Sequence, residues 1–334
     1  MVFALRWSFL WVASALDCAW IGKRPRAAVD ATCVRLPMKE AAKVAPEDLA
    51  EALLFFPELR ELHLSWLQLG DQRLEEIAQV FRRGQHRALE RLYLAHNNLG
   101  ISGGRAIASA LGYLPHLKVL NLPENAIRAE GAEALAKALP KTPLLEQLVL
   151  AGNGLGLRGT QAIAQALPHL PHLQDLHLSR NALGTQGALA LARVLYSGHG
   201  AALEWLSLSD NALGDVGLQA LSAAVKRTPR LEWLDLEQNA LSDLGAKALS
   251  RALLKASAPP APDEDEDDRH RHLGCRLREL SLQKNPIGAE GHQWLQKVQE
   301  QLPEFQFWID GRQVGSAERS TLKEMVPLSL TAVM

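Results

Sequence analysis

The sequence predicts an α/β solenoid, a horseshoe with short parallel strands on its concave face and helices on its convex face. The first observation is a leucine pattern that recurs along most of the 334 residues. The second is a switch of hydrophobic period, from two to about 3.6 residues, inside each copy. The third is the spacing of the copies, whose first leucines are 30, 28, 28, 28, 30, 28 and 46 residues apart. The array is therefore continuous, with one insertion before its last copy.

Seven of the eight copies follow the pattern Leu-x-x-Leu-x-Leu-x-x-Asn-x-Leu/Ile-x-x-x-Gly, and the first, which starts at Leu59, has Leu67 in place of the asparagine and Arg73 in place of the glycine. The Leu-x-Leu core alternates with period two and predicts a strand, whereas the stretch after the glycine, as in Gly131-x-x-Ala134-Leu135-Ala136-x-x-Leu139, has helical spacing. We expect the glycine to open the turn into the helix. Parallel strands lie about 4.8 Å apart, but packed helices need about 8 to 10 Å, so the stacked copies must curve with their strands inside.

One asparagine recurs just after every complete strand. Its amide can donate to and accept from backbone groups that are otherwise buried without a partner. We therefore expect a structural ladder, not a set of ligand contacts. Its members are Asn97, Asn125, Asn153, Asn181, Asn211, Asn239 and Asn285.

The copy from Leu117 to Leu139 resembles the ribonuclease-inhibitor-like subfamily of leucine-rich-repeat proteins. It is also similar to the repeat domains of NOD-like receptors and of the Ran GTPase-activating protein. The resemblance covers roughly residues 59 to 302 and implies a horseshoe that holds a partner protein. The chain has no phosphate-binding Gly-x-x-x-x-Gly-Lys-Ser/Thr motif, so we do not expect a complete NOD-like receptor.

The expected organisation is one continuous body with atypical ends. An N-terminal apolar segment (1–28) precedes an N-terminal cap (29–58), in which residues 33–36 form a strand and residues 46–56 a helix. Repeats 1 to 7 (59–256) are followed by an acidic, disordered insertion (257–272) and repeat 8 (273–302). A C-terminal cap (303–314) has Phe305, Phe307 and Ile309 alternating in an edge strand, and a tail (315–334) ends the chain.

Residues 1–28 leave four interpretations open. Apolar residues three or four apart fit a capping helix. Arg6, a short apolar stretch and Ala13-Ser14-Ala15 fit a secretory signal, and a transmembrane helix is the third interpretation. The fourth is a disordered or wrongly assigned start upstream of Met38. Three scattered cysteines favour a reducing compartment. We expect a cytoplasmic protein, with a secreted or organellar location as the alternative if this segment is a targeting signal.

The residues that flank the last two leucines of each strand are expected to face the concave space. Trp205 and Trp233 occupy the same position in consecutive copies, which predicts an exposed aromatic ridge about one strand spacing apart. Carboxylates surround this ridge, and basic residues are nearly absent from the strands. An aromatic centre with such a surround is typical of a binding hot spot, although the tryptophans could also simply pack on each other. The candidate partner-binding residues are Trp205, Trp233, Asp235, Glu237, Asp175, His177, Asp210, Glu279 and Tyr93.

Composition argues against several classes of function. A formal net charge of -1 does not suit a phosphate-backbone binder, so no nucleic-acid partner is expected. We predict no metal, no cofactor and no enzyme activity, because His177 with Asp175 and Ser179 is the nearest approach to a catalytic cluster and lies on an open surface.

The function that these patterns favour is a non-catalytic scaffold that binds another protein on its concave face. We expect that partner to present basic and apolar groups, and we expect a monomer without a membrane partner. The alternatives are a GTPase-activating regulator of a small GTPase and the recognition part of an immune-type receptor.

Overall fold

The computed structural model describes residues 33–35, 46–225, 227–257, 276–302, 304–309 and 312–314. The expectations for the N-terminal apolar segment, for the tail 315–334 and for the acidic insertion beyond Ser257 lie outside these residues. Within them, the α/β solenoid predicted from the leucine pattern is confirmed.

Eleven strands form one sheet whose spatial order is the chain order. Strands β1 to β10 run parallel to their neighbours, and β11 pairs antiparallel with β10. The strands are β1 (Cys33–Arg35), β2 (Glu61–His63), β3 (Arg91–Tyr93), β4 (Val119–Asn121), β5 (Gln147–Val149), β6 (Asp175–His177), β7 (Trp205–Ser207), β8 (Trp233–Asp235), β9 (Glu279–Ser281), β10 (Gln306–Ile309) and β11 (Arg312–Val314).

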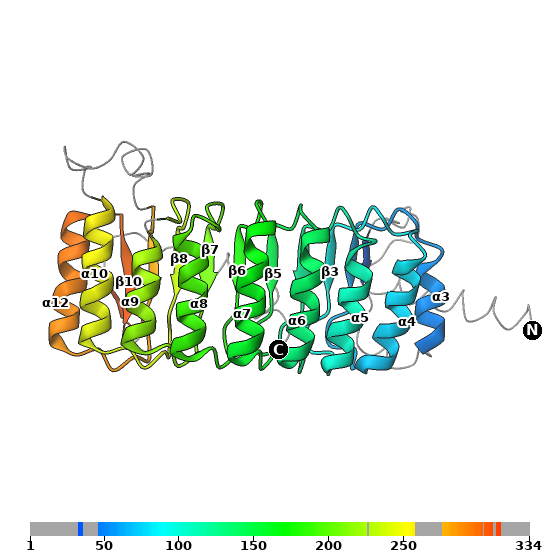
Figure 1. Ribbon diagram of the computed structural model, residues 1–334, viewed down its shortest axis with the longest axis horizontal. Helices are drawn as coiled ribbons and strands as arrows, with labels where there is room; N and C mark the ends of the chain where they lie inside the picture. The colour runs from blue at the N-terminus through cyan, green and yellow to red at the C-terminus, as the bar shows by residue number, and fades with distance from the viewer. Residues whose placement is uncertain are drawn as a thin grey trace, which may run out of the picture.

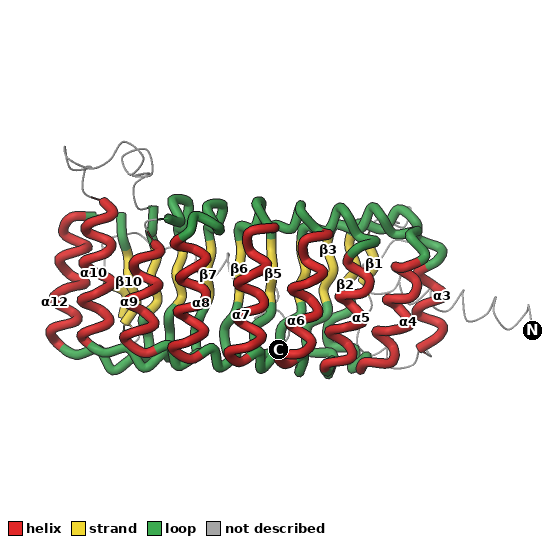
Figure 2. The backbone as a smooth tube through the Cα atoms, in the orientation of Figure 1, coloured by secondary structure: helices red, strands yellow, loops and turns green. Residues whose placement is uncertain are grey.

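The helices form a second layer against the sheet. Figure 1 shows them side by side in chain order, and Figure 2 shows the strands behind them. They are α3 (Pro46–Leu53), α4 (Gly70–Arg82), α5 (Ile101–Leu111), α6 (Arg128–Ala138), α7 (Gly156–Ala166), α8 (Gly184–Tyr196), α9 (Gly214–Val225), α10 (Asp243–Ser257) and α12 (Ala289–Gln301), with short 3-10 turns η1 (Leu139–Lys141) and η2 (Leu167–His169).

The core lies between the two layers and is built from leucines in register. The central leucine of each strand pairs with the central leucine of the next, as Leu176 does with Leu206 and Leu206 with Leu234. All eight such leucines from β2 to β9 are at most 3% exposed. Because full burial of a leucine side chain contributes about 1.5 to 3 kcal/mol, this column fixes which face of each strand is left for other contacts.

The recurring glycine of the pattern is required by close packing and not by the turn. Gly131 lies inside the first turn of α6, and its φ is not in the left-handed region. A Cβ atom there would lie 2.5 Å from Cγ2 of Ile127, and one at Gly217 would lie 2.9 Å from Cβ of Ala188. The prediction that this glycine opens the turn is therefore wrong, since close packing excludes a side chain.

The asparagines form a buried ladder along one end of the strands. All seven are at most 8% exposed. Asn181 is representative: its Oδ1 accepts from the backbone N–H groups of Asn153 and Leu155 at 2.9 and 3.3 Å, and its Nδ2 donates to the carbonyl of Leu150 at 2.9 Å. These side chains satisfy backbone groups of the neighbouring repeats, as a structural role requires.

The ladder is interrupted at Asn153. Its Nδ2 donates to the carbonyls of Leu122 and Leu150 at 2.9 and 3.0 Å, but its Oδ1 is buried without a hydrogen-bond partner. In the equivalent loop of the preceding repeat, the N–H of Ala126 donates to the carbonyl of Leu99 at 2.6 Å, and Arg128 has a φ of 57°. The equivalent residues Ala182, Ala212 and Ala240 have positive φ, whereas Ala126 does not. This loop conformation leaves Oδ1 of Asn153 without the backbone N–H donors that the other asparagines have.

The ends of the array differ in part from expectation. A strand lies at Cys33–Arg35 and a helix at Pro46–Leu53, where a capping strand and helix were predicted. At the other end, Phe305, Phe307 and Ile309 are at most 2% exposed, and β10 continues the parallel sheet. It is not the edge strand, however, because β11 turns back and covers it.

Candidate functional site

The two tryptophans at equivalent positions of β7 and β8 stack on each other. Trp205 and Trp233 are register partners, their ring centroids lie 3.9 Å apart, and their planes make an angle of 15°. In-register parallel strands bring such rings together. Both side chains are half-buried and neither belongs to the exposed large hydrophobic residues, so the prediction of an exposed ridge is wrong in that respect. Each ring covers part of the other.

Three carboxylates flank this tryptophan stack without a countercharge. Burial raises the pKa of Asp175 to about 6, and the nearby charge of Glu204 adds to this effect. Burial also raises the pKa of Asp235 and of Glu279. Among the described residues, no ion pair involves any of the three. Their negative charge is therefore costly in the free protein and suited to a cation brought from outside.

Neutral donors position two of these carboxylates. Nε2 of Gln147 donates to Oδ2 of Asp175 at 3.2 Å. The hydroxyl of Ser207 donates to Oδ2 of Asp235 at 2.8 Å and lies 2.6 Å from the hydroxyl of Ser179. Such hydrogen bonds favour the charged carboxylate but do not neutralise it.

His177 completes the inner part of this surface. Its ring centroid lies 5.7 Å from that of Trp205, and burial lowers its pKa to about 4, so the imidazole is neutral at pH 7. Its Nε2 is buried without a hydrogen-bond partner, as are Nε1 of Trp233 and Oε2 of Glu279. Because buried polar atoms are normally paired, these three unpaired atoms lower the stability of the free protein at this surface.

Of the outer members of the predicted set, Glu237 has a countercharge and Asp210 has a neutral donor. Oε1 of Glu237 pairs with Nζ of Lys284 at 2.7 Å, and Oδ1 of Asp210 accepts from Nε2 of Gln238 at 3.1 Å. Asp210 is exposed and lies in the loop after β7. These two carboxylates therefore form a rim around the tryptophan stack.

Tyr93 does not join this group. It lies on β3, with three strands between it and β7, and it stacks on His63 with ring centroids 4.3 Å apart and planes 9° apart. The structure therefore brings together Trp205, Trp233, Asp175, His177, Asp235 and Glu279, with Glu237 and Asp210 at their edge, and places Tyr93 elsewhere on the concave face.

Sequence reasoning missed two residues of this surface. Trp308 on β10 is the register partner of Ser281, so it lies on the concave side and not only in the cap. The alternation of buried Phe307 and Ile309 carried this signal, because the residue between them must face the other way. Lys284 was missed because it lies in the loop after β9, outside the strand residues that are expected to face the concave space.

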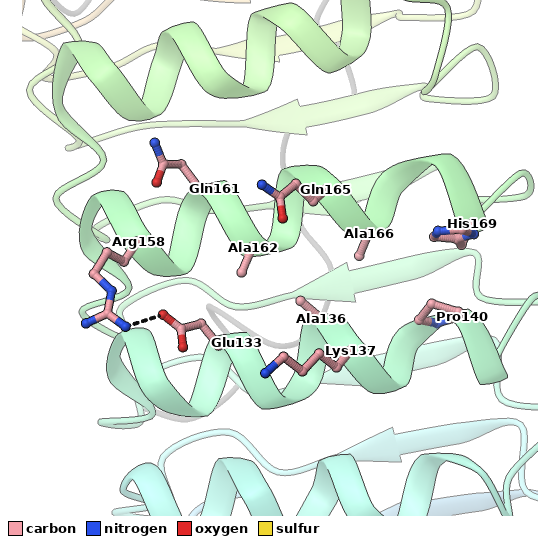
Figure 3. A pocket seen from close by; sticks show the side chains of 10 residues that line it. All are labelled: Glu133, Ala136, Lys137, Pro140, Arg158, Gln161, Ala162, Gln165, Ala166 and His169. Carbon is pink, nitrogen blue, oxygen red and sulfur yellow. Dashed lines mark hydrogen bonds and ion pairs between the residues drawn. The ribbon is translucent and has the colours of Figure 1, made fainter.

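The convex side has a groove of about 460 Å³ between α6 and α7. Figure 3 shows it lined by Ala136, Ala162 and Ala166, with the Arg158–Glu133 ion pair at one end. The two charged groups lie 2.8 Å apart and neutralise each other. Its lining residues do not place a nucleophilic side chain next to a base, so it is a surface groove between packed helices.

No helix in the described part of the chain has the length and apolar character needed to cross a bilayer.

The fold and this surface define an open strand–helix solenoid with one polar and aromatic face. The family model for the Leucine Rich repeat matches residues 85–108, 113–136, 169–192, 203–222, 231–250 and 275–293. The chain is a leucine-rich-repeat protein. No curated protein matches it.

Solved structures that are similar to this chain include a TLR13–ssRNA13 complex and a Bacteroides fragilis protein. The crystal structure of a TLR13–ssRNA13 complex has a TM-score of 0.42 and 19% identity, covering 77% of this chain and only 33% of that one. The crystal structure of a Bacteroides fragilis protein has a TM-score of 0.48 and 15% identity, covering 95% of this chain and 84% of that one. Neither similarity bears on what this chain binds.

Proposed function

We propose that this protein is a non-catalytic scaffold that binds a basic partner protein on the C-terminal half of its concave face. The observation that carries the proposal is the stack of Trp205 on Trp233 beside uncompensated carboxylates. Leucine-rich-repeat proteins are generally protein-binding scaffolds, which supports the general class. A cytoplasmic location and a monomeric state belong to the proposal.

The chemistry of the partner follows from the charges. A lysine or arginine of the partner, placed near Asp175 or Asp235, would supply the countercharge that these carboxylates lack. Its aliphatic stem would pack on the indole rings. Desolvated aromatic residues surrounded by polar groups are where binding energy concentrates.

The proposal is tested by affinity capture from a cell extract at moderate salt. The bait is the full chain, compared with a Trp205→Ala/Trp233→Ala variant. Two aromatic controls are matched to it: Tyr93→Ala on the N-terminal half of the same face, and Tyr196→Ala on the convex helix α8. We expect a protein with a basic surface to be retained by wild type and both controls and lost by the double variant.

Equal retention by the double variant, with circular dichroism showing that it is folded, would contradict the proposed surface. Loss in the Tyr196→Ala control instead would move the binding site to the helices. In either case the tryptophans would pack on each other for stability alone.

A further inference from the structure

A cysteine, a glutamate and a histidine meet at the N-terminal end of the concave face. Sγ of Cys33 lies 4.0 Å from Oε2 of Glu61, and Nε2 of His63 lies 3.4 Å from the same oxygen. The three candidate ligand atoms are all within 4.8 Å of one another. Across the ranges that the structure describes, no other group of three such side chains comes this close.

The strand register produces this cluster. Cys33 and Glu61 are register partners on β1 and β2, and His63 lies two residues after Glu61 on the same face of β2. Side chains at these positions are cross-strand neighbours and second neighbours along one strand, so they converge without any special loop. The sequence gives no hint of this, because 28 residues separate Cys33 from Glu61 and no ligand spacing motif is present.

Neighbouring side chains hold two of the three groups in place. Nη1 of Arg91 donates to Oε1 of Glu61, which leaves Oε2 directed at the cysteine and histidine. The ring of His63 lies flat on Tyr93, at 4.3 Å between centroids. Groups that fix the orientation of ligand side chains are a regular feature of metal sites in proteins.

The distances suit a tetrahedral metal ion of the zinc class. With metal–sulfur bonds of about 2.3 Å and metal–nitrogen or metal–oxygen bonds of about 2.0 Å, sulfur and oxygen ligands lie about 3.5 Å apart and nitrogen and oxygen ligands about 3.3 Å apart. The observed 4.0 and 3.4 Å are within small side-chain movements of these values. A thiolate with an imidazole selects Zn²⁺ over Mg²⁺ or Ca²⁺, which prefer oxygen.

We propose that Cys33, Glu61 and His63 bind one Zn²⁺ ion, leaving its fourth coordination position open. Thiolate and carboxylate supply two negative charges to the ion, and Cys33 is exposed, so the ion can enter from solvent. The open position takes water or a side chain of a bound protein. This site goes beyond the proposed partner surface and is independent of it, since four strands separate β2 from β7.

The test uses Co²⁺ as a spectroscopic substitute for Zn²⁺ on the full chain. A thiolate ligand gives Co²⁺ a charge-transfer absorption band that water and carboxylates do not give. We expect one Co²⁺ per chain with this band, and displacement of Co²⁺ by Zn²⁺. Cys33→Ser should abolish the band, and His63→Phe, which keeps an aromatic ring on Tyr93, should weaken binding about 100-fold or more.

The other two cysteines provide matched controls. Cys18→Ser and Cys275→Ser should keep both the band and the affinity, and Glu61→Gln should weaken binding while it keeps an acceptor for Arg91. Circular dichroism without metal must be the same for all variants that are compared. The proposal is overturned if no band forms, if the band survives Cys33→Ser, or if Cys275→Ser removes it.

Discussion

The two halves of the repeat array differ in how the carboxylates on and beside their strands are compensated. In the N-terminal half, Glu61 pairs with Arg91, and Glu90 pairs with Lys118 at 3.1 Å and with Arg60 at 3.3 Å. In the C-terminal half, Asp175 and Asp235 are half-buried beside the tryptophan stack and, among the described residues, accept hydrogen bonds from neutral donors, whereas Glu237 at the rim pairs with Lys284. The same strand and helix repeat builds both halves, so this difference lies in the side chains.

The difference separates the residues that build the fold from those of the proposed binding surface. Buried leucines and the asparagine ladder are repeated in both halves and account for the fold. A half-buried carboxylate without a countercharge lowers stability, and its place beside the half-buried indole rings fits the proposed role in binding. The paired carboxylates of the N-terminal half carry no such cost.

The largest expected effect tests whether the two halves share one scaffold. Leu92→Ala and Leu206→Ala each remove a central strand leucine that is at most 3% exposed. Both should lower the free energy of unfolding by about 2 to 5 kcal/mol, from lost burial and the cavity left behind. Urea unfolding followed by circular dichroism measures this. A cost confined to one half would show that the repeats do not contribute alike.

The next effect compares two rungs of the ladder. Asn181→Ala strands the N–H groups of Asn153 and Leu155 and the carbonyl of Leu150, which should cost about 2 to 3 kcal/mol. Asn153→Ala removes an oxygen that has no partner and only the Nδ2 bonds, so its cost should be about 1 kcal/mol. Equal costs in the same urea melts would contradict the interruption at Asn153.

A smaller effect of opposite sign is expected at Asp175. Its pKa of about 6 in the folded protein lies above the ordinary 3.8, so the folded state holds the proton more tightly. Stability from this group is present below pH 3.8 and is lost as the pH rises through 6. Asp175→Asn should therefore stabilise the protein by about 1 to 2 kcal/mol at pH 7.5 and by almost nothing at pH 4. Thermal melts at both pH values measure this, and a destabilised variant at pH 7.5 would contradict it.

The smallest effect is the counterpart in the N-terminal half. The hydrogen bond from Lys118 lowers the pKa of Glu90, so the ionised form is favoured in the folded state and its contribution is lost as the pH falls through that lowered pKa. Glu90→Gln should destabilise the protein at pH 7.5 by less than about 1 kcal/mol, because the pair is near the surface. The same thermal melts apply. A stabilised Glu90→Gln variant would erase the contrast between the halves.

The fold could be predicted because every repeat carries the same leucine pattern. Leu206 and Leu234 occupy one position of a pattern with a clear period, and parallel strands put equivalent positions side by side. That geometry also gave the Trp205 and Trp233 pairing. Burial could not be predicted in the same way, because the rings cover each other and the pKa of Asp175 depends on neighbours in space.

Contacts between loops and strands were also beyond the pattern. Lys284 reaches Glu237 from outside the strand, and the loop at Ala126 removes the partners of Asn153 although the asparagine itself fits the repeat. The meeting of Cys33 with His63 depends on the register of an atypical first strand that carries no leucine pattern.

The central claim is that a partner lies on the C-terminal half of the concave face, and site-specific photo-crosslinking tests it most directly. A photoreactive residue replaces Ser209, which follows β7 and hydrogen-bonds to Asp235, or Leu244, which is 70% exposed on the convex helix α10. The account predicts a covalent adduct with one basic protein from position 209 and none from position 244. Adducts of equal yield from both positions, or an adduct from position 244 alone, would contradict it.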